Sequence, residues 1–267
     1  MTLGQKMKRE KITLDRIEQW ARRNPALVML CIVVIISSSV VSLLDGGARL
    51  REVYRHTLGR NSRNYENIEA LATETHIDYF SSLLGPPVFK NRHGTYREHI
   101  FVNPNFYVQA VTNTDGTVLL YSVTTRSRRF NPRLNLGIME SNGETFIVVL
   151  GKTTFAKIRG EPIKIEGSVG ARRMSYREKY YFGNPGLYQN YNFVLCDAGN
   201  VPDGEVNPGD VKYESMDGID TQKLPSRLMR FRETCPINTF SVSAPHSDID
   251  DKIPAIGPDY DQVRVLK

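Results

Sequence analysis

Residues 25–44, PALVMLCIVVIISSSVVSLL, form an apolar run of twenty residues without a charged side chain. At about 1.5 Å per residue, a helix of this length spans about 30 Å, the thickness of the hydrocarbon core of a bilayer. We therefore expect a single transmembrane helix over residues 25–44. A cleaved signal peptide usually has a shorter apolar core and an A-x-A-like site, and a buried core helix rarely lacks a polar face over this length, so both alternatives fit less well.

Basic residues flank this run on both sides. Residues 1–24 carry seven Lys and Arg side chains, and residues 45–72 contain five Arg side chains, all before residue 64. The first segment is amphipathic over residues 12–21, and the second is expected to be a helical juxtamembrane linker. The positive-inside rule favours, by a small margin, a cytoplasmic N-terminus and an exported, periplasmic C-terminal part.

The net charge of +6 is concentrated beside the apolar run. Residues 1–24 have a net charge of +4, residues 45–64 have +3, and residues 65–267 have −1. The excess positive charge is therefore placed to meet anionic lipid headgroups, which we expect as membrane partners. The rest of the chain has no basic bias, so nucleic acid is not expected as a partner.

A sequence pattern occurs twice after residue 72. Phe80–Pro87 and Phe155–Pro162 both read F-x-x-[L/I]-x-G-x-P, a Tyr-Arg-Glu triplet occurs at residues 96–98 and 176–178, and Asn-Pro follows at residues 103–104 and 184–185. Three matches in the same order at a spacing of 75–81 residues indicate an internal duplication. We therefore predict two small modules, over residues 73–134 and 135–200.

Each module has the pattern of a short helix followed by strands. In the first, a Thr75-x-x-Asp78 capping box and a helical apolar spacing predict a helix that ends at Gly85. Alternating residues then predict strands over 98–102, 106–112 and 117–125, and the second module repeats this with a helix near 153–158 and strands over 176–182 and 187–196. The predicted fold is α+β: each module is a short helix or helical hairpin on an antiparallel sheet, and the two sheets are continuous or abutting.

Residues 201–267 form a Pro- and Gly-rich C-terminal extension. Its composition predicts mostly irregular structure that partly wraps the second module. Two patterned pieces stand out: a helix over residues 224–231 and a strand over residues 239–242.

The repeated F-x-x-[L/I]-x-G-x-P motif with its aromatic-rich hairpin resembles the small outer-membrane-assembly lipoproteins of the SmpA/OmlA type, and the tandem arrangement resembles the β-lactamase inhibitor protein architecture. The chain differs from these families because it has no lipobox cysteine. The whole chain, with the LGKTTF stretch at residues 150–155 and GPDYDQVRVL at residues 257–266, is also similar to a family of uncharacterised single-pass bacterial membrane proteins. This resemblance implies an anchored protein of the bacterial inner membrane and no activity.

No catalytic or cofactor motif is present in the sequence. The five histidines have no metal-ligand spacing, no G-x-S-x-G elbow occurs, and Gly151-Lys152-Thr153 lacks the first glycine of a phosphate-binding loop. We therefore expect neither an enzyme nor a cofactor. Cys196 and Cys235 form either a disulfide, if the domain is exported, or two thiols, if it is cytoplasmic.

The densest basic cluster after residue 72 contains Arg126, Arg128, Arg129 and Arg133. It is a candidate binding site for an acidic partner, and the alternative is a solvated linker. The tyrosines of the predicted strands are either a recognition face or core residues; they are Tyr107, Tyr121, Tyr180, Tyr181, Tyr188 and Tyr191.

These observations favour a membrane-anchored, non-catalytic protein that presents a duplicated sheet module to a protein partner. Two further hypotheses remain. The first is an envelope enzyme or a cytoplasmic-face effector that acts on a small ligand or lipid. The second is a homo-oligomeric scaffold joined through the Ser37–Ser39 part of the span.

Overall fold

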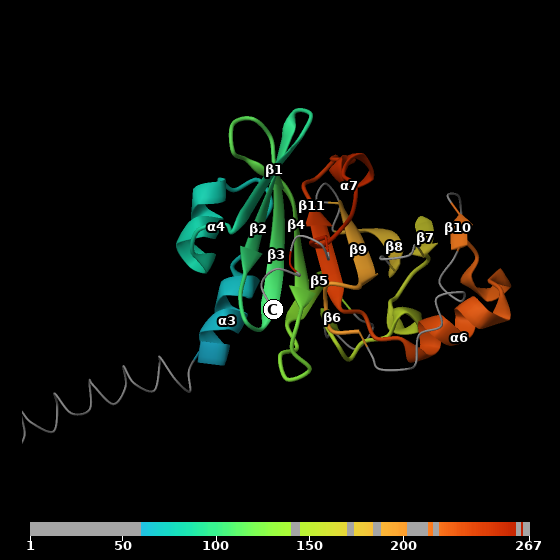
Figure 1. Cartoon of the computed structure of the whole chain (residues 1–267). Helices are drawn as coiled ribbons and strands as arrows, with labels where there is room; N and C mark the ends of the chain where they lie inside the picture. Colours follow the sequence, from blue (N-terminus) through green and yellow to red (C-terminus); the bar gives the residue numbers. More distant parts are fainter. Residues whose placement is uncertain are drawn as a thin grey trace, which may run out of the picture. The chain divides into compact units, whose positions relative to one another are not determined.

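The computed structural model describes residues 60–139, 145–169, 174–183, 188–201, 213–215, 219–259 and 263. Within these residues the fold is α+β, as predicted, with few helices and a nine-stranded antiparallel sheet in the order β1-β2-β3-β4-β11-β9-β8-β7-β10 (Figure 1). The predicted transmembrane helix at residues 25–44 lies outside the described residues. Among the helices of the described part, none combines the length and the apolar character needed to cross a bilayer.

Two helices and four strands form the first half of the sheet and its cover. They are α3 (Arg60–Glu69), α4 (Ile77–Leu84), β1 (Phe89–His93), β2 (Tyr96–Val102), β3 (Phe106–Thr112) and β4 (Val118–Thr125). The helical apolar spacing predicted α4, and the alternating patterns predicted β2, β3 and β4, to within about two residues.

The remaining elements come from residues 133–252. They are β5 (Arg133–Met139), β6 (Thr145–Val149), the 3-10 helix η1 (Phe155–Lys157), β7 (Lys164–Val169), β8 (Met174–Phe182), β9 (Gln189–Cys196), β10 (Tyr213–Ser215), the 3-10 helix η2 (Thr221–Lys223), α6 (Ser226–Thr234), β11 (Thr239–Ser243) and α7 (Ile249–Lys252). Strands β5 and β6 form a separate two-stranded sheet.

Helix α4 starts one residue later than the predicted capping box requires. His76 is the N-cap, and its Nδ1 accepts a hydrogen bond from the Asp78 amide, whereas the Thr75 hydroxyl donates to the Ala72 carbonyl. At the other end, Gly85 has a φ of +84° and its amide donates to the Ser81 carbonyl. The glycine therefore ends the helix as predicted, because a left-handed φ is strained for residues with a side chain.

The repeated F-x-x-[L/I]-x-G-x-P motif has several structural features in common in its two copies. Phe80 and Phe155 are both fully buried in the main hydrophobic core. Gly85 and Gly160 have φ angles of +84° and +79°, and a strand begins four residues after each glycine. The motif therefore specifies a buried phenylalanine and a left-handed glycine before a strand in both copies, although Phe80 lies within an α-helix and Phe155 begins a 3-10 helix.

The Tyr-Arg-Glu match, in contrast, is not structurally equivalent in the two halves. Phe89 and Lys164 each lie four residues after their glycine, and their partners on the next strand are Ile100 and Lys179, which differ by 79 positions rather than 80. A shift of one residue turns a side chain to the opposite face of a sheet. Consequently Glu98 and Glu178 lie on opposite faces, and this part of the proposed duplication is a coincidence of sequence.

The two halves of the sheet are joined by a strand from the C-terminal part of the chain. β11 pairs with β4 on one side and with β9 on the other, and all five of its residues are buried. The strand itself was predicted over residues 239–242, but the expectation of a mostly irregular extension missed its central position. Without β11, strands β4 and β9 would have no common neighbour in the described sheet.

The main core lies on one face of this sheet. Helices α3 and α4 cover the β2–β4 half, and η1 and α6 cover the β7–β9 half, where Phe155 stacks on Phe231 at 5.9 Å between ring centroids. We call this the core face. The other face has a smaller apolar cluster that includes Val111, Leu120 and Val194.

A buried ion pair holds α6 on the core face. The Glu178 carboxylate is fully buried and accepts hydrogen bonds from Arg232 Nε, at 2.6 Å, and from the hydroxyls of Tyr176 and Tyr180, both at 2.6 Å. Burial, followed by the nearby Glu178 charge, raises the pKa of both tyrosines, so both hydroxyls remain donors. All four polar groups are thus satisfied without water.

Replacing Arg232 by Met should strongly destabilise the protein, because it leaves the Glu178 carboxylate buried without its cation. We expect a loss of about 3–5 kcal/mol in the free energy of unfolding, measured by urea denaturation of the full chain in detergent. The control Arg230→Met removes an exposed arginine from the same helix and should change stability by less than about 0.5 kcal/mol. Equal stability of the two variants would contradict this role of the ion pair.

Candidate functional site

A row of polar side chains crosses the face opposite the core. The strand register places the members of this row opposite one another on neighbouring strands: Gln109 opposite Ser122, Ser122 opposite Ser241, and Ser241 opposite Asn192. All four side chains are buried. Because buried polar groups need hydrogen-bond partners, this face cannot be covered by a purely apolar segment.

Residues 247–259, which we call the C-terminal strap, cover this row. The Gln109 amide donates to the Ala255 carbonyl and its oxygen accepts from the Gly257 amide at 2.8 Å. Ile249 and Ile256 complete the small apolar cluster. Gly257 has a φ of +86°, and a Cβ there would lie 3.1 Å from Cys196 Sγ, so the strap passes closely over the sheet at a glycine.

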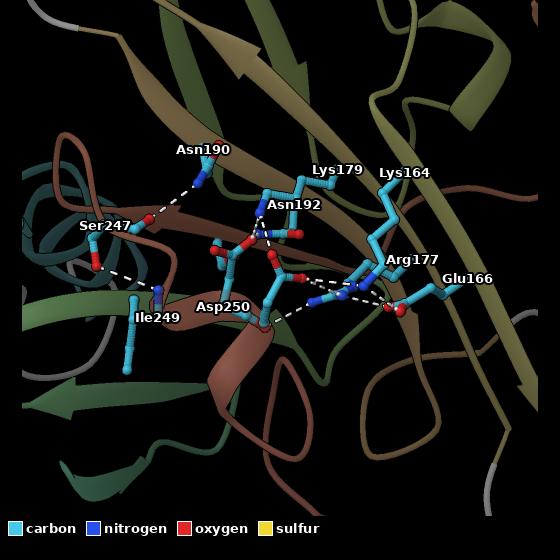
Figure 2. Close-up of polar contacts among 11 residues, drawn as sticks. Lys164, Glu166, Arg177, Lys179, Asn190, Asn192, Ser247, Ile249 and Asp250 are labelled. Carbon is cyan, nitrogen blue, oxygen red and sulfur yellow. Dashed lines mark hydrogen bonds and ion pairs between the residues drawn. The ribbon is translucent and has the colours of Figure 1, made fainter. Parts of the chain in front are cut away.

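A cluster of six charged side chains lies where α7 meets β7 and β8 (Figure 2). We call it the charged cluster. Its members are Lys164, Glu166, Arg177, Lys179, Asp250 and Asp251. Lys164 pairs with Lys179 and Glu166 with Arg177 across β7 and β8, so all four strand residues project from the same face.

The two aspartates of α7 have different environments. The Asp250 side chain is fully buried, and its Oδ2 lies 2.9 Å from Lys179 Nζ and accepts from Asn192 Nδ2 at 3.3 Å. The Asp251 side chain is 37% exposed, and its carboxylate contacts three cations: Lys179 at 2.7 Å, Lys164 at 3.2 Å and Arg177 at 3.3 Å. Asp250 therefore belongs to the interior, and Asp251 lies at the edge of the cluster.

Three members of the charged cluster, Lys164, Glu166 and Asp251, have pKa values shifted away from neutrality. Burial alone would raise the pKa values of Asp251 and Glu166, but hydrogen bonds and charges outweigh it: Lys179 and Lys164 lower the pKa of Asp251, and Lys164 and Arg177 lower that of Glu166. Burial would likewise lower the pKa of Lys164, and its bonds to Glu166 and Asp251 raise it. These groups are held in their charged forms, which suits the binding of charged groups better than proton transfer at neutral pH.

A pocket of about 490 Å³ opens beside the charged cluster. Its lining includes the paired residues Ser168 and Ser175, five members of the charged cluster (Lys164, Glu166, Arg177, Asp250 and Asp251) and two further carboxylates, Asp197 and Asp259. The strap contributes an apolar wall that includes Ile253, Pro254 and Pro258. The pocket thus combines charge, hydroxyl groups and apolar surface within a volume typical of small-molecule sites.

The predicted arginine cluster divides into two parts. Arg126 is partly buried, donates to the Asn103 carbonyl at 2.9 Å and lies 4.4 Å above the Tyr107 ring. Arg128, Arg129 and Arg133 are exposed. Arg126 is therefore engaged by the fold, and only the other three arginines remain candidates for partner binding.

Cys196 and Cys235, for which the sequence left both a disulfide and two thiols open, are not bonded to each other in the structure. Both are buried thiols, and each donates to a backbone carbonyl at 3.7 Å: Cys196 to Pro258 and Cys235 to Pro236. Cys235 belongs to the core face, whereas Cys196 belongs to the apolar cluster of the opposite face. The sheet therefore separates the two sulfur atoms.

The strand tyrosines also divide into two groups. Tyr107, Tyr121, Tyr180 and Tyr191 are buried. Tyr181 and Tyr188 are 46% and 38% exposed, and their rings stack at 5.2 Å between centroids. The core interpretation is therefore confirmed for four of the tyrosines, and Tyr181 and Tyr188 form an exposed aromatic pair for which a recognition role stays a prediction.

The sequence analysis missed the charged cluster. Its signals were the alternation Lys164-x-Glu166 and Arg177-x-Lys179, which puts each pair on one face of a strand, and the Asp250-Asp251 doublet. Neither signal has a characteristic spacing, because the residues meet only through strand pairing and the return of the strap.

No family model matches the chain, and no curated protein or solved structure is significantly similar to it.

The charged cluster should make stability dependent on acidic pH. Because the folded pKa values of Asp251 and Glu166 are lowered, their contribution is present above their unfolded pKa values, near 4, and is lost as the pH falls through the folded values. Asp251→Asn should lower the free energy of unfolding at pH 7 by about 1 kcal/mol, a modest value because the side chain is over one-third exposed, and should flatten the acid slope.

Urea denaturation between pH 7 and pH 3 measures this slope. Asp248→Asn, which changes an exposed aspartate one residue before α7, serves as the matched control and should keep the wild-type slope. The expectation fails if the slope is the same for all three proteins.

Proposed function

We propose that this chain is a membrane-anchored binding protein whose soluble part presents a partner-binding surface centred on Tyr181 and Tyr188. The observation that carries the proposal is the stack of two exposed tyrosines. Exposed aromatic side chains of this size are enriched at the centres of protein interfaces, where each can contribute several kcal/mol.

The sheet supports this surface in two ways. Tyr181 lies on β8 and pairs with Asn190 of β9, and both strands are hydrogen-bonded on each side to further strands. Tyr181 also lies two residues after Lys179, so it shares a face with the charged cluster. Because Tyr181 is fixed on a strand and Tyr188 directly precedes β9, the pair loses little conformational entropy when a partner binds.

The membrane anchor is the second part of the proposal. It rests on the uncharged run at residues 25–44 and on the basic residues that flank it. An anchor of this kind would hold the partner-binding surface near the bilayer and raise the local concentration of a membrane-associated partner. A reporter fused after Lys267 would give the side of the membrane on which the domain lies.

Loss of the tyrosine pair should abolish partner capture. In cells expressing the full chain, the Tyr181→Ala/Tyr188→Ala variant should retain less than about a tenth of the protein that cross-links to wild type, since an aromatic hot spot costs 2 kcal/mol or more. Tyr79→Ala is the matched control, because Tyr79 is 41% exposed but lies on α4. Equal capture by the double variant and by the control would reject this surface.

The exposed arginines offer a second test. If the partner contacts this patch instead, reversing the charge of Arg128, Arg129 and Arg133 to Glu should reduce capture while the tyrosine variant has no effect. We expect instead that the tyrosine variant reduces capture and that the arginine variant does not. Arg126 is left unchanged in this variant because its contacts with Asn103 and Tyr107 stabilise the fold.

A further inference from the structure

Strand β1 lies at one end of the nine-stranded sheet, so one of its edges has no partner strand in the described sheet. A two-residue turn at residues 94–95 joins β1 to β2. A hairpin of this kind closes on a hydrogen-bonded pair, here His93 and Tyr96, and further hydrogen-bonded pairs recur at every second residue. The backbone N–H and C=O groups of Lys90 and Arg92 therefore point away from β2, toward the open edge.

The side chains along this edge are basic. Lys90 and Arg92 are exposed and lie two residues apart, so they share one face of β1. Across the hairpin, the exposed Arg97 lies directly opposite Arg92, and the buried His99 lies opposite Lys90. Among the described residues, no carboxylate forms an ion pair with Lys90, Arg92 or Arg97.

The positive charge on this face is unfavourable in the free protein. Cations that lie directly opposite each other on neighbouring strands repel, as Arg92 and Arg97 do here. Burial, followed by the charges of Lys90 and Arg97, lowers the pKa of His99, whereas the weaker influence of Glu98 raises it. Because Glu98 is the residue next to His99 on the strand, its side chain lies on the opposite face. A ligand that brings negative charge to this edge would relieve the repulsion.

The same charges determine which strand can pair with β1. In an added antiparallel strand, one residue lies directly opposite Lys90 and another, two positions away, lies opposite Arg92, with their side chains on the same face. A second copy of β1 would place Arg92 opposite Lys90, so the basic residues oppose self-association. Acidic residues at alternate positions would match both cations, so the edge discriminates between partners by charge.

We propose that β1 is a binding site for an extended segment of a partner protein that has acidic residues at alternate positions and adds to the sheet as a further antiparallel strand. Backbone hydrogen bonds to Lys90 and Arg92 supply the pairing, and the side chains of these residues supply the specificity. This edge lies in the half of the sheet that does not contain Tyr181, so failure of either surface leaves the other unaffected.

Fluorescence anisotropy of labelled peptides tests strand addition to the full chain in non-ionic detergent. The probe is a peptide of alternating glutamate and valine. The same peptide with N-methylated glutamates keeps its charge but loses the N–H donors that would reach the carbonyls of Lys90 and Arg92. We expect saturable binding of the first peptide and at least tenfold weaker binding of the second. Glutamine in place of glutamate should weaken binding to a similar extent, because the complementary charge is lost.

Charge reversal tests the assignment of residues. Lys90→Glu/Arg92→Glu should bind the glutamate–valine peptide at least tenfold more weakly than wild type and should instead bind a lysine–valine peptide, a gain that also shows that the variant is folded. Arg227→Glu/Arg230→Glu is the matched control, because it reverses two exposed arginines of α6, and it should bind the glutamate–valine peptide as wild type does. If thermal unfolding shows that the charge-reversed β1 variant is not folded, Lys90→Gln/Arg92→Gln replaces it, with the same expected loss.

Three results would each overturn the site: no saturable binding of the glutamate–valine peptide to wild type, binding of the N-methylated peptide as tight as that of the unmodified one, or an equal loss of affinity in the β1 variant and the α6 control.

Discussion

The buried polar row on the sheet determines much of what surrounds it. Gln109, Ser122, Ser241 and Asn192 lie side by side across four strands and cannot be left without partners in the interior. The strap supplies partners for this row with the backbone of residues 255 and 257 at one end and with Asp250 at the other, although Asn192 Oδ1 has none. Thus the path of the strap, the position of α7 and the closeness of Asp251 to three cations all follow from one constraint.

Different kinds of interaction stabilise the two faces of the sheet. On the core face, aromatic rings and aliphatic side chains pack against helices, and a buried ion pair between Glu178 and Arg232 is supported by the hydroxyls of Tyr176 and Tyr180. On the opposite face, amides, hydroxyls and charged groups exceed the apolar contacts. Several buried oxygen atoms there have no hydrogen-bond partner, including Asn192 Oδ1 and Asp250 Oδ1. A face of this composition is better suited to exchange of polar contacts than the core face is.

Local patterns in the sequence predicted local structure well. The alternation in β3 and β4, the helical spacing of α4 and the glycine that ends it were all readable from neighbouring residues. The predicted duplication was correct for Phe80 and Phe155, which are equivalent in the two halves. It was wrong for Glu98 and Glu178, because a register shift of one residue places them on opposite faces of the sheet. The charged cluster could not be predicted, since Lys164, Arg177 and Asp251 lie up to 87 residues apart and meet only through pairing across strands. For the same reason the sequence left the pairing of Cys196 and Cys235 open: spacing along the chain does not tell which face a cysteine occupies.

The central position of β11 has a consequence for how the chain is made. Strand β4 ends at residue 125, but its second neighbour begins only at residue 239. While a ribosome synthesises the intervening residues, β4 presents an open edge of buried, β-prone residues, and β9 later does the same. Edges of this kind readily pair with other chains. A chain that stops before residue 239 would therefore leave two half-sheets with unpaired edge strands. The last tenth of the sequence thus protects newly made molecules from aggregation, because it pairs with both edges.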